Sequence, residues 1–431
     1  MSTDTSAWWP APRAERPVDA TVSLPSSKSL TNRALVLAAI APGPSILHRP
    51  LVARDTELMA AALRALGTSV TAVSSAAGGD GWRVEPAALH GAADVDCGLA
   101  GTVMRFVPPL AALARGPVRL DGDPRARERP LAEVVIALRN LGVRVDLEDG
   151  RSGLPVTVHG TGSVRGGVVE LDASASSQFV SGLLLVGARF DEGVDVRHRG
   201  GPLPSLPYVR MTVTELRRRG VEVDDEQPDR WVVRPGGIAA LDCVVEPDLS
   251  SGAPLLAAAL VTGGRVRVRA WPERTDQAGD RLRELLAAMG ADVYRDGTDL
   301  VVSADAAIEG LTLDLHDVGE LVPVLAVLCA LADAPSRLTG LAHLRGHESD
   351  RLAAIAAEVN ALGGAITELA DGLHVDPRPL RPGRWHTYDD HRMAQAGAVL
   401  SLGVPGLKIE DVETTAKTFP GFVNAWTELL R

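Results

Sequence analysis

The sequence predicts an α/β protein whose two domains are built from six copies of one supersecondary unit. Six segments share a pattern in which a short apolar strand enters a loop of small and polar residues, and an alanine- and leucine-rich helix follows. Their period of roughly 70 residues indicates that a whole unit of strands and helices is repeated. The segments open at Leu24, Cys97, Leu171, Val245, Leu313 and Thr387.

A second, amphipathic helix follows in five of the copies. Apolar residues recur there at steps of three and four, and a closing glycine supplies a left-handed cap. Short β-type runs such as VRVDLED and VEVDDE come next, so we expect each copy to run strand, helix, strand, helix, strand, strand. The five helical segments are residues 57–67, 131–142, 209–220, 281–290 and 351–364.

The copies divide evenly about residue 246, which predicts two domains of three copies each. We expect the chain to pass between the domains at the polar turns near Ser23–Pro25 and Glu246–Asp248, through a tight two-stranded hinge. A short N-terminal segment then belongs with the C-terminal half. The predicted domains are residues 24–246, and residues 1–23 together with residues 247–431.

Composition narrows the class of protein. Hydrophobic residues make up 45% of the 431, which excludes disorder, while aromatic residues make up 3%, so we expect cores of Leu, Val and Ala. The net charge of −11 argues against a nucleic-acid-binding surface. We expect no signal peptide and no membrane-spanning segment, and we interpret Cys97, Cys243 and Cys329 as buried thiols. These features favour a soluble cytoplasmic protein.

Polar loops precede the predicted helices, whose N-termini favour anions. In SSKSLTNR, backbone N–H groups, Lys28, Ser29 and Arg33 would converge on one anion. In CGLAGTVMR, Gly101 would let a ligand approach the backbone closely, with Arg105 behind it. An ordinary capped helix and a tight packing turn are the alternative interpretations of these two loops.

Further loops of the first half offer cationic and neutral donors. An arginine of DGDPRARERP that points into a cleft could hold a carboxylate or phosphate, although most such arginines are solvated. The serine-rich loops suit phosphate and hydroxyl oxygens, although most are simply helix caps. The candidate donors are Arg125, Arg127, Arg129, Ser176, Ser177, Gln178, Ser205 and Tyr208.

The second half supplies carboxylates at the edges of helices. Glu320 lies one step from a very apolar helix, and Glu348 follows His347 in LRGHESDRL. A carboxylate in such a position can transfer protons, while a capping role is the alternative. DDHRM and AKTFPG then add the cations Arg392 and Lys417.

Other polar residues of this half have simpler interpretations. His391 is interpreted as a hydrogen-bonded structural histidine, and Asp389 and Asp390 as helix N-caps. His343 and His347 are four residues apart in a loop-like stretch, but no third ligand has a convincing spacing for a metal site. No GxGxxG motif stands at a strand-to-helix turn, so a nicotinamide site is not expected.

Lysine is rare in this chain, since only Lys28, Lys408 and Lys417 are found among 44 basic residues. Two of the three lie in polar motif loops, which indicates a need for a compact ammonium group that a planar guanidinium would not meet. Chance retention is the alternative.

Eight motifs occur in one order along the chain: SSKSLTNR, GLAGT-x-MR, RERP, SASSQF, SLPY, HESDR, DDHRM and KTFPGF. In this order and spacing, from about Leu24 to Phe422, the chain resembles the EPSP synthase (3-phosphoshikimate 1-carboxyvinyltransferase) family. The resemblance implies two domains, each an inside-out α/β barrel of three βαβαββ units, closing around the substrates. It also implies a reaction without metal or cofactor, in which phosphoenolpyruvate gives its enolpyruvyl group to the 5-hydroxyl of shikimate 3-phosphate and phosphate leaves.

The resemblance implies the site residues position by position. It assigns shikimate 3-phosphate to Lys28, Ser29, Arg33, Ser176, Ser177, Gln178, Ser205, Tyr208, Glu320 and His347. It assigns phosphoenolpyruvate to Lys28, Gly101, Arg129, Gln178, Arg351, Arg392 and Lys417. Because these cations come from both halves, we expect their repulsion to hold the empty cleft open until anions bind.

The catalytic residues that the resemblance implies are Glu320, Glu348 and Lys28. Glu320 would accept the proton of the 5-hydroxyl, Glu348 would deliver a proton to the methylene carbon, and Lys28 would assist the leaving phosphate. The roles of the two acids could be exchanged. Gly101 implies sensitivity to glyphosate, which occupies the phosphoenolpyruvate pocket in this family.

Several positions depart from the commonest family pattern. Glu320 stands where aspartate is frequent, His347 where lysine is frequent and His343 where asparagine is frequent, which puts the substrate contacts of both histidines in doubt. Rival readings are an enolpyruvyl transferase acting on UDP-N-acetylglucosamine, whose mobile loop usually carries a cysteine that is missing here, and a non-catalytic anion-binding protein. We expect a monomer, since the cleft lies within one chain.

Overall fold

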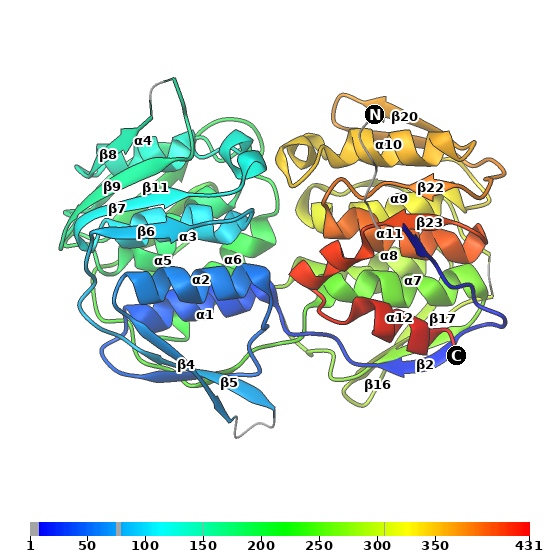
Figure 1. The fold of residues 1–431 in the computed structure, drawn as a ribbon, viewed down its shortest axis with the longest axis horizontal. Coiled ribbons are helices and arrows are strands. Elements are labelled where there is room, and N and C mark those ends of the chain that lie inside the picture. The colour runs from blue at the N-terminus through cyan, green and yellow to red at the C-terminus, as the bar shows by residue number, and fades with distance from the viewer. Residues whose placement is uncertain (1–7, 75–78, 149, 306) are drawn as a thin grey trace. The chain divides into compact units, whose positions relative to one another are not determined.

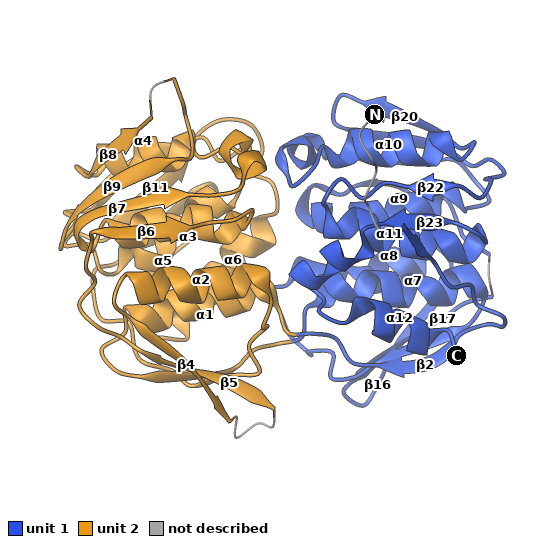
Figure 2. Ribbon diagram, in the orientation of Figure 1, with its two compact units in different colours: residues 1–25, 247–431 blue, residues 26–246 orange. Residues whose placement is uncertain are grey.

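The structure is a computed structural model that describes residues 8–74, 79–148, 150–305 and 307–431. It divides into two compact units (Figure 2): unit 2 is Ser26–Glu246, and unit 1 combines Met1–Pro25 with Pro247–Arg431. The first boundary thus follows Pro25 and not residue 23. Residues 1–7, where the segment expected to lack a signal peptide begins, lie outside the described residues.

Two copies of unit 2 follow the predicted order of strands and helices without interruption. In both, the first strand is parallel to the second, the second pairs antiparallel with the fourth, and the third pairs with the fourth at the edge. One copy consists of β6 (Ala93–Asp96), α3 (Gly101–Ala111), β7 (Arg115–Asp121), α4 (Ala132–Asn140), β8 (Arg144–Leu147) and β9 (Val156–Thr161). The other consists of β10 (Gly167–Leu171), α5 (Gln178–Gly187), β11 (Val194–His198), α6 (Leu206–Arg217), β12 (Val223–Asp224) and β13 (Arg230–Val233).

At each chain crossing, a strand pairs within one unit although the next helix along the chain belongs to the other unit. β2 (Asp19–Val22) precedes α1 (Lys28–Ala39) in sequence but pairs with β15 (Arg265–Val268) of unit 1. β14 (Cys243–Val244) precedes α7 (Ala253–Thr262) but pairs with β3 (Ser45–His48) of unit 2. At the crossings, the Ser27 N–H donates to the Glu246 carbonyl at 2.8 Å, and the Asp248 N–H donates to the Pro25 carbonyl at 2.7 Å. The remaining elements of this unit 2 copy are α1 (Lys28–Ala39), β3 (Ser45–His48), α2 (Arg54–Ala65), β4 (Ser69–Ser74) and β5 (Asp80–Glu85).

Unit 1 repeats the same sheet topology twice more. The copy that receives β2 continues with α7 (Ala253–Thr262), β15 (Arg265–Val268), α8 (Leu282–Ala288), β16 (Asp292–Asp296) and β17 (Asp299–Ser303). The next consists of β18 (Thr312–Asp314), the 3-10 helix η4 (His316–Leu321), α9 (Val322–Ala330), β19 (Ser336–Thr339), η5 (Ala342–Gly346), α10 (Arg351–Ala361), β20 (Ala365–Leu369) and β21 (Gly372–Asp376).

The sixth copy departs from the predicted pattern, because its described residues contain no second pair of strands. Its sheet takes β1 (Trp8–Pro10) from the N-terminal segment. This strand pairs antiparallel with β23 (Lys408–Glu410) where the other sheets have their fourth strand. The N-terminal residues therefore belong with unit 1 through this sheet as well as through β2. The copy consists of β22 (Arg384–Trp385), α11 (His391–Gly403), β23 (Lys408–Glu410), η6 (Val412–Lys417) and α12 (Phe422–Leu429).

Helices form the interior of each unit, and sheets form its outside. In unit 2 the β4–β5 sheet and the β7–β9–β8 sheet lie outside the helices (Figure 1). Every residue of α3 and of α9 is buried, whereas strands such as β9 and β15 alternate between buried and more exposed residues. The inside-out arrangement is thus confirmed, and its cores are mainly Leu, Val and Ala. Among the described residues, each helix is too short or too polar to cross a bilayer.

The predicted glycine caps and buried thiols are confirmed. Gly67, Gly142, Gly220, Gly290 and Gly363 all have positive φ angles just beyond the second helices, where a left-handed residue ends a helix. Helices α2 and α6 begin at residues 54 and 206, earlier than the expected 57 and 209. The three cysteines are buried, and burial raises the pKa of each thiol, that of Cys329 to about 11.

Candidate active site

The N-terminus of α1 presents Lys28 together with a buried acid. Ser27 caps the helix by accepting the Leu30 N–H at 3.4 Å, so Lys28 is the first helical residue. Its Nζ lies 3.1 Å from Oδ2 of Asp55, a buried carboxylate in the first turn of α2. Because one partner of this pair is buried, the ammonium is held in place at the helix end. Asp55 therefore positions the lysine that the motif predicted.

Arg33 lies one turn further along α1 and is buried. Its Nε donates to the Thr212 hydroxyl at 2.8 Å, Nη2 to the Tyr208 carbonyl at 2.8 Å and Nη1 to the Ser29 carbonyl at 3.1 Å. These bonds connect α1 to α6. Arg33 therefore fixes the positions of the predicted ligands Ser29 and Tyr208. The motif predicted a different role, a direct contact with the anion.

Two guanidinium groups flank the N-terminus of α3. A Cβ on Gly101 would lie 2.9 Å from Nη1 of Arg105 and 3.0 Å from Nη2 of Arg129, so a side chain here would displace both. Arg129 donates to the Leu99 carbonyl at 3.1 Å. The other arginines of its loop pair elsewhere on the surface, Arg125 with Glu128 and Arg127 with Asp121. Of the three predicted arginines, the structure thus brings Arg129 to Gly101.

Gln178 opens helix α5 and connects to the same arginine cluster. Its Oε1 accepts from Nη1 of Arg105 at 3.0 Å, which orients the amide, and its backbone N–H donates to the Ser176 hydroxyl at 3.3 Å. Ser177, in the N-cap position, is buried. Ser205, in the N-cap position of α6, has a left-handed backbone with φ 54°. The predicted polar donors therefore lie at helix N-termini of unit 2.

In unit 1, Glu348 is held between two cations. Its Oε1 lies 2.8 Å from Nζ of Lys417, and its Oε2 accepts from Nη2 of Arg351 at 3.0 Å. Arg351 also donates to both carboxylate oxygens of Asp390, at 2.8 and 3.1 Å. Burial alone would lower the pKa of Arg351, but Asp390 and Glu348 outweigh it, and the pKa is raised above its usual value. The guanidinium is therefore charged at any working pH.

Arg392 joins three copies of unit 1. Its Nη2 lies 3.4 Å from Oε2 of Glu320, and its Nη1 donates to the Ser250 carbonyl at 3.0 Å. Asp390 is the N-cap of α11, as predicted, and accepts the Arg392 N–H at 2.9 Å. Asp389 is not the capping residue. The structure thus connects two groups of charged side chains through Asp390, which binds the Arg351 guanidinium and the Arg392 backbone N–H. One group is Lys417, Glu348 and Arg351, and the other is Arg392 and Glu320.

Three histidine rings lie beside this cluster. The His343 ring is 5.9 Å from that of His316 and 5.8 Å from that of His347, measured between centroids. Burial, followed by the proximity of His316 and Arg351, lowers the pKa of His343 to about 4, so it is neutral at pH 7. Nδ1 of His347 lies 3.0 Å from Nη1 of Arg351. In the described part of the chain, no group of His, Cys, Asp and Glu side chains could hold a metal ion.

Comparison with known proteins identifies the family. The family model for EPSP synthase (3-phosphoshikimate 1-carboxyvinyltransferase) matches residues 12–426. The chain belongs to the EPSP synthase family. A curated 3-phosphoshikimate 1-carboxyvinyltransferase from Kocuria rhizophila is 54% identical over 430 residues, which cover 98% of this chain and 96% of that protein.

Solved structures agree on the fold. An EPSP synthase from Acinetobacter baumannii matches with a TM-score of 0.80 at 24% identity, covering 99% of this chain and 98% of that one. The enolpyruvyl transferase NikO from Streptomyces tendae matches with a TM-score of 0.76 at 20% identity, covering 97% and 96%. At these identities the likeness concerns the fold, and it confirms the predicted two-domain α/β architecture.

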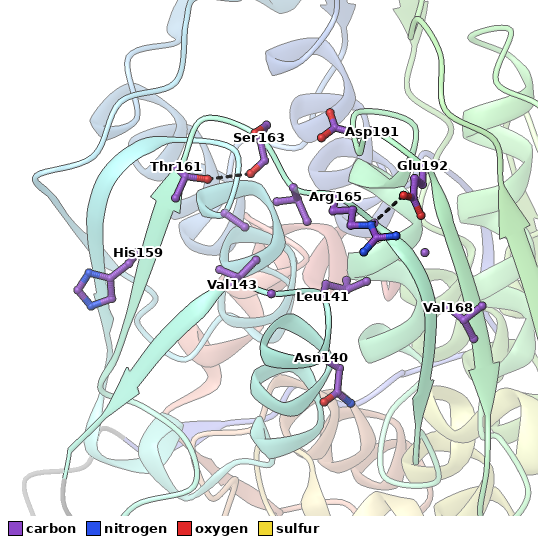
Figure 3. A pocket seen from close by; sticks show the side chains of 15 residues that line it. Asn140, Leu141, Val143, His159, Thr161, Ser163, Arg165, Val168, Asp191 and Glu192 are labelled. Atoms are coloured by element: carbon purple, nitrogen blue, oxygen red, sulfur yellow. Dashed lines mark hydrogen bonds and ion pairs between the residues drawn. The ribbon is translucent and has the colours of Figure 1, made fainter.

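A surface pocket of unit 2 lies apart from the family's motif residues (Figure 3). It encloses about 600 Å³ between the end of α4 at Asn140 and the loops that carry Arg165 and Glu192. Helices α3 and α4 both end at this pocket, and Arg165 is already bonded to Glu192 at 2.8 Å. Helix C-termini and carboxylates repel anions, so this pocket suits polyanionic substrates poorly. None of the predicted site residues is among its described lining residues.

Sequence reasoning missed the positioning roles of Asp55, Asp390 and Arg105. Asp55 and Asp390 each lie far along the chain from the cation that they hold, 27 residues from Lys28 and 39 from Arg351. Arg105 was noted as lying behind Gly101, but its bond to the Gln178 side chain was not predicted. A buried charged residue near a motif is the signal that could have found them, because such a residue needs a partner.

Proposed function

We propose that the polar N-termini of unit 2 and the charged cluster of unit 1 supply the residues of one active site. The reaction is the transfer of the enolpyruvyl group of phosphoenolpyruvate to the 5-hydroxyl of shikimate 3-phosphate, which releases phosphate. The observation that carries the site is Glu348, a buried carboxylate held between Lys417 and Arg351. A protein that only binds anions gains nothing from a carboxylate there, whereas a proton transfer requires one.

Unit 2 would hold shikimate 3-phosphate. Its phosphate needs several donors, and the N-termini of α1, α5 and α6 supply backbone N–H groups as well as side chains. Arg33 stabilises this surface through Ser29 and Tyr208. The proposed ligands from this unit are Lys28, Ser29, Arg33, Ser176, Ser177, Gln178, Ser205 and Tyr208, to which Glu320 and His347 of unit 1 are added.

Phosphoenolpyruvate would be collected by cations of both units. A carboxylate and a phosphate on one small molecule match several arginine and lysine side chains, and arginine can bind such groups with two parallel hydrogen bonds. Gly101 leaves room beside Arg129 because a side chain there would meet the guanidinium groups. The proposed ligands are Lys28, Gly101, Arg129, Gln178, Arg351, Arg392 and Lys417.

The chemistry would be an addition followed by an elimination. As the 5-hydroxyl oxygen bonds to C2 of phosphoenolpyruvate, Glu320 accepts the hydroxyl proton and Glu348 delivers a proton to C3, which gives a tetrahedral intermediate. C3 then returns a proton to Glu348, and the bond between C2 and the phosphate oxygen breaks. Phosphate leaves, with Lys28 at the leaving oxygen. Exchanged roles for the two acids satisfy the same proton balance.

The contacts of Glu348 connect substrate binding to this proton transfer. Its two cations stabilise the ionised carboxylate in the substrate-free enzyme. The phosphate and carboxylate of phosphoenolpyruvate would compete for Lys417 and Arg351 and draw them away. Glu348 could then take up the proton that it delivers to C3.

The setting of the enzyme follows from the same proposal. Both substrates are small anions of biosynthetic metabolism, so we place the enzyme in the cytoplasm and expect it to act as a monomer without nucleic-acid or membrane partners. The sugar-nucleotide alternative would need a reactive cysteine near the site. Cys97 is the cysteine nearest along the chain to the DGDPRARERP loop, and it is buried. Burial raises the pKa of its thiol, which opposes its use as a nucleophile.

Phosphate release tests the proposal. The purified enzyme is given phosphoenolpyruvate with shikimate 3-phosphate, and in parallel phosphoenolpyruvate with UDP-N-acetylglucosamine. We expect release with shikimate 3-phosphate and none with the sugar nucleotide. Release with the sugar nucleotide alone would overturn the substrate assignment, and release with neither would favour a binding protein.

A further inference from the structure

The loop that leads into α11 has an unfavourable backbone. Tyr388 and Asp389 are consecutive non-glycine residues with φ angles of 56° and 55°. L-residues rarely adopt this left-handed conformation, and two in succession persist only where surrounding contacts hold them. The next residue, Asp390, caps α11 and binds Arg351. The contacts that maintain this strained turn therefore also set the position of Asp390.

Glu358, on α10, supplies those contacts. It is buried, with 4% of its surface exposed. Its Oε1 accepts from the Tyr388 hydroxyl at 2.7 Å, and its Oε2 accepts from the His386 backbone N–H at 2.9 Å and lies 3.2 Å from the His386 ring Nδ1. Burial, followed by this hydrogen bond to the carboxylate, raises the pKa of Tyr388. The hydroxyl thus stays protonated and keeps donating.

Helix α10 therefore contacts the loop at both ends. Arg351 and Glu358 lie seven residues apart on α10, which is two turns, so they share one face of the helix. Arg351 binds Asp390 at the end of the loop, and Glu358 binds His386 and Tyr388 at its start. A substitution at Glu358 would therefore affect Arg351 indirectly, through the loop and Asp390.

The N-terminal strand covers the outside of this loop. The Trp8 ring packs edge-on against the His386 ring at 5.3 Å between centroids, and the Arg384 guanidinium lies 4.8 Å from the Trp8 ring. The Thr387 N–H donates to Glu410 on β23 at 3.2 Å, and Glu410 is also the register partner of Trp8. Contacts from α10, β1 and β23 thus surround the same few residues.

We propose that Glu358 and Tyr388 are positioning residues for the phosphoenolpyruvate side of the site. They hold the 386–390 loop so that Asp390 fixes the Arg351 guanidinium and begins the helix that carries Arg392. Neither acts on the substrate directly. This inference rests on the proposed function, which assigns phosphoenolpyruvate to Arg351 and Arg392.

The test is Tyr388→Phe, which removes one hydrogen bond and keeps the ring. Hydrogen bonds to charged groups are among the stronger ones, so we expect the KM for phosphoenolpyruvate to rise about five- to tenfold. The KM for shikimate 3-phosphate and kcat should stay within about twofold. Tyr294→Phe is the matched control, since Tyr294 lies in the same unit and is 42% exposed against 43% for Tyr388. A KM for phosphoenolpyruvate that matches the control would overturn the proposal, as would an equal rise for both substrates.

A second variant and a second readout separate this inference from the proposed function. Trp8→Ala should raise the KM for phosphoenolpyruvate in the same way, and Trp8→Phe should restore it. The Arg351 Nε–H resonance, assigned with Arg351→Lys in nitrogen-15-labelled enzyme, should shift in Tyr388→Phe but not in Tyr294→Phe, whether or not the enzyme turns over. An unshifted resonance would refute the positioning role. A shifted resonance in an enzyme that releases no phosphate would refute the proposed function alone.

Discussion

Gly101→Ala would move the two arginines that flank the start of α3. The added Cβ would lie 2.9 Å from Arg105 Nη1 and 3.0 Å from Arg129 Nη2, whereas non-bonded carbon contacts are comfortable at about 3.5–4.0 Å. Both guanidinium groups must therefore shift by a few tenths of an ångström. Overpacking of this kind costs about 1–3 kcal/mol. If the binding free energy of the anion becomes less favourable by that amount, its affinity falls by about 5- to 150-fold.

The assay for this variant measures the inhibition constant of glyphosate and the KM values of both substrates. We expect the inhibition constant to rise by at least about fivefold and the KM for phosphoenolpyruvate to rise in the same direction. The KM for shikimate 3-phosphate should rise less, because Gln178, which accepts from Arg105, is the proposed ligand of that substrate that contacts this arginine pair. Gly237→Ala is the control, since a Cβ there meets nothing within 4 Å. An unchanged inhibition constant would refute the assignment of Gly101 to the phosphoenolpyruvate pocket.

Three further predictions concern charged groups. Glu348→Gln and Glu320→Gln should each lower kcat at least about 100-fold while calorimetry still detects binding of both substrates; undiminished turnover would remove the acids from the mechanism. Asp55→Asn should leave Lys28 without its buried anionic partner and raise both KM values several-fold, whereas a fall in melting temperature alone would mean a structural role. His343 binds a proton more readily in the unfolded protein than in the folded one. The free energy of unfolding should therefore fall by up to about 3 kcal/mol as the pH drops from about 6.5 to 4. Urea unfolding of the enzyme and of His343→Asn at pH 7 and pH 4.5 checks this, and an equal loss of stability in both would contradict it.

The acids show where prediction from sequence stopped. Glu320 and Glu348 could be named because they lie in motifs next to apolar helices, but their partners could not. Glu348 meets Lys417 across 69 residues of sequence, and Glu358 meets Tyr388 across 30. Such pairs depend on how helices of different copies pack, and the local hydrophobic pattern of the sequence does not determine that packing.

The sixth copy shows a second kind of limit. Its helix and its two parallel strands follow the repeat, so the pattern predicted them. The strand that completes its sheet is Trp8–Pro10, from the opposite end of the chain. A strand of three residues has too little alternation to indicate a partner, and its pairing is decided by where the chain crossings leave the N-terminal segment.

The sequence by itself determined the repeat and the polar helix N-termini, because period and hydrophobic patterning indicate which segments form helices and strands, and its motifs implied the inside-out fold through the family resemblance. Tertiary structure placed Arg105 and Arg129 beside Gly101, where a Cβ would lie 2.9 and 3.0 Å from their guanidinium nitrogens. Tertiary structure alone decided which acid holds which cation. Asp55 holds Lys28, and Asp390 holds Arg351. Those ion pairs form only once separate helices pack and withdraw the carboxylates from water, and a buried carboxylate needs a charged partner.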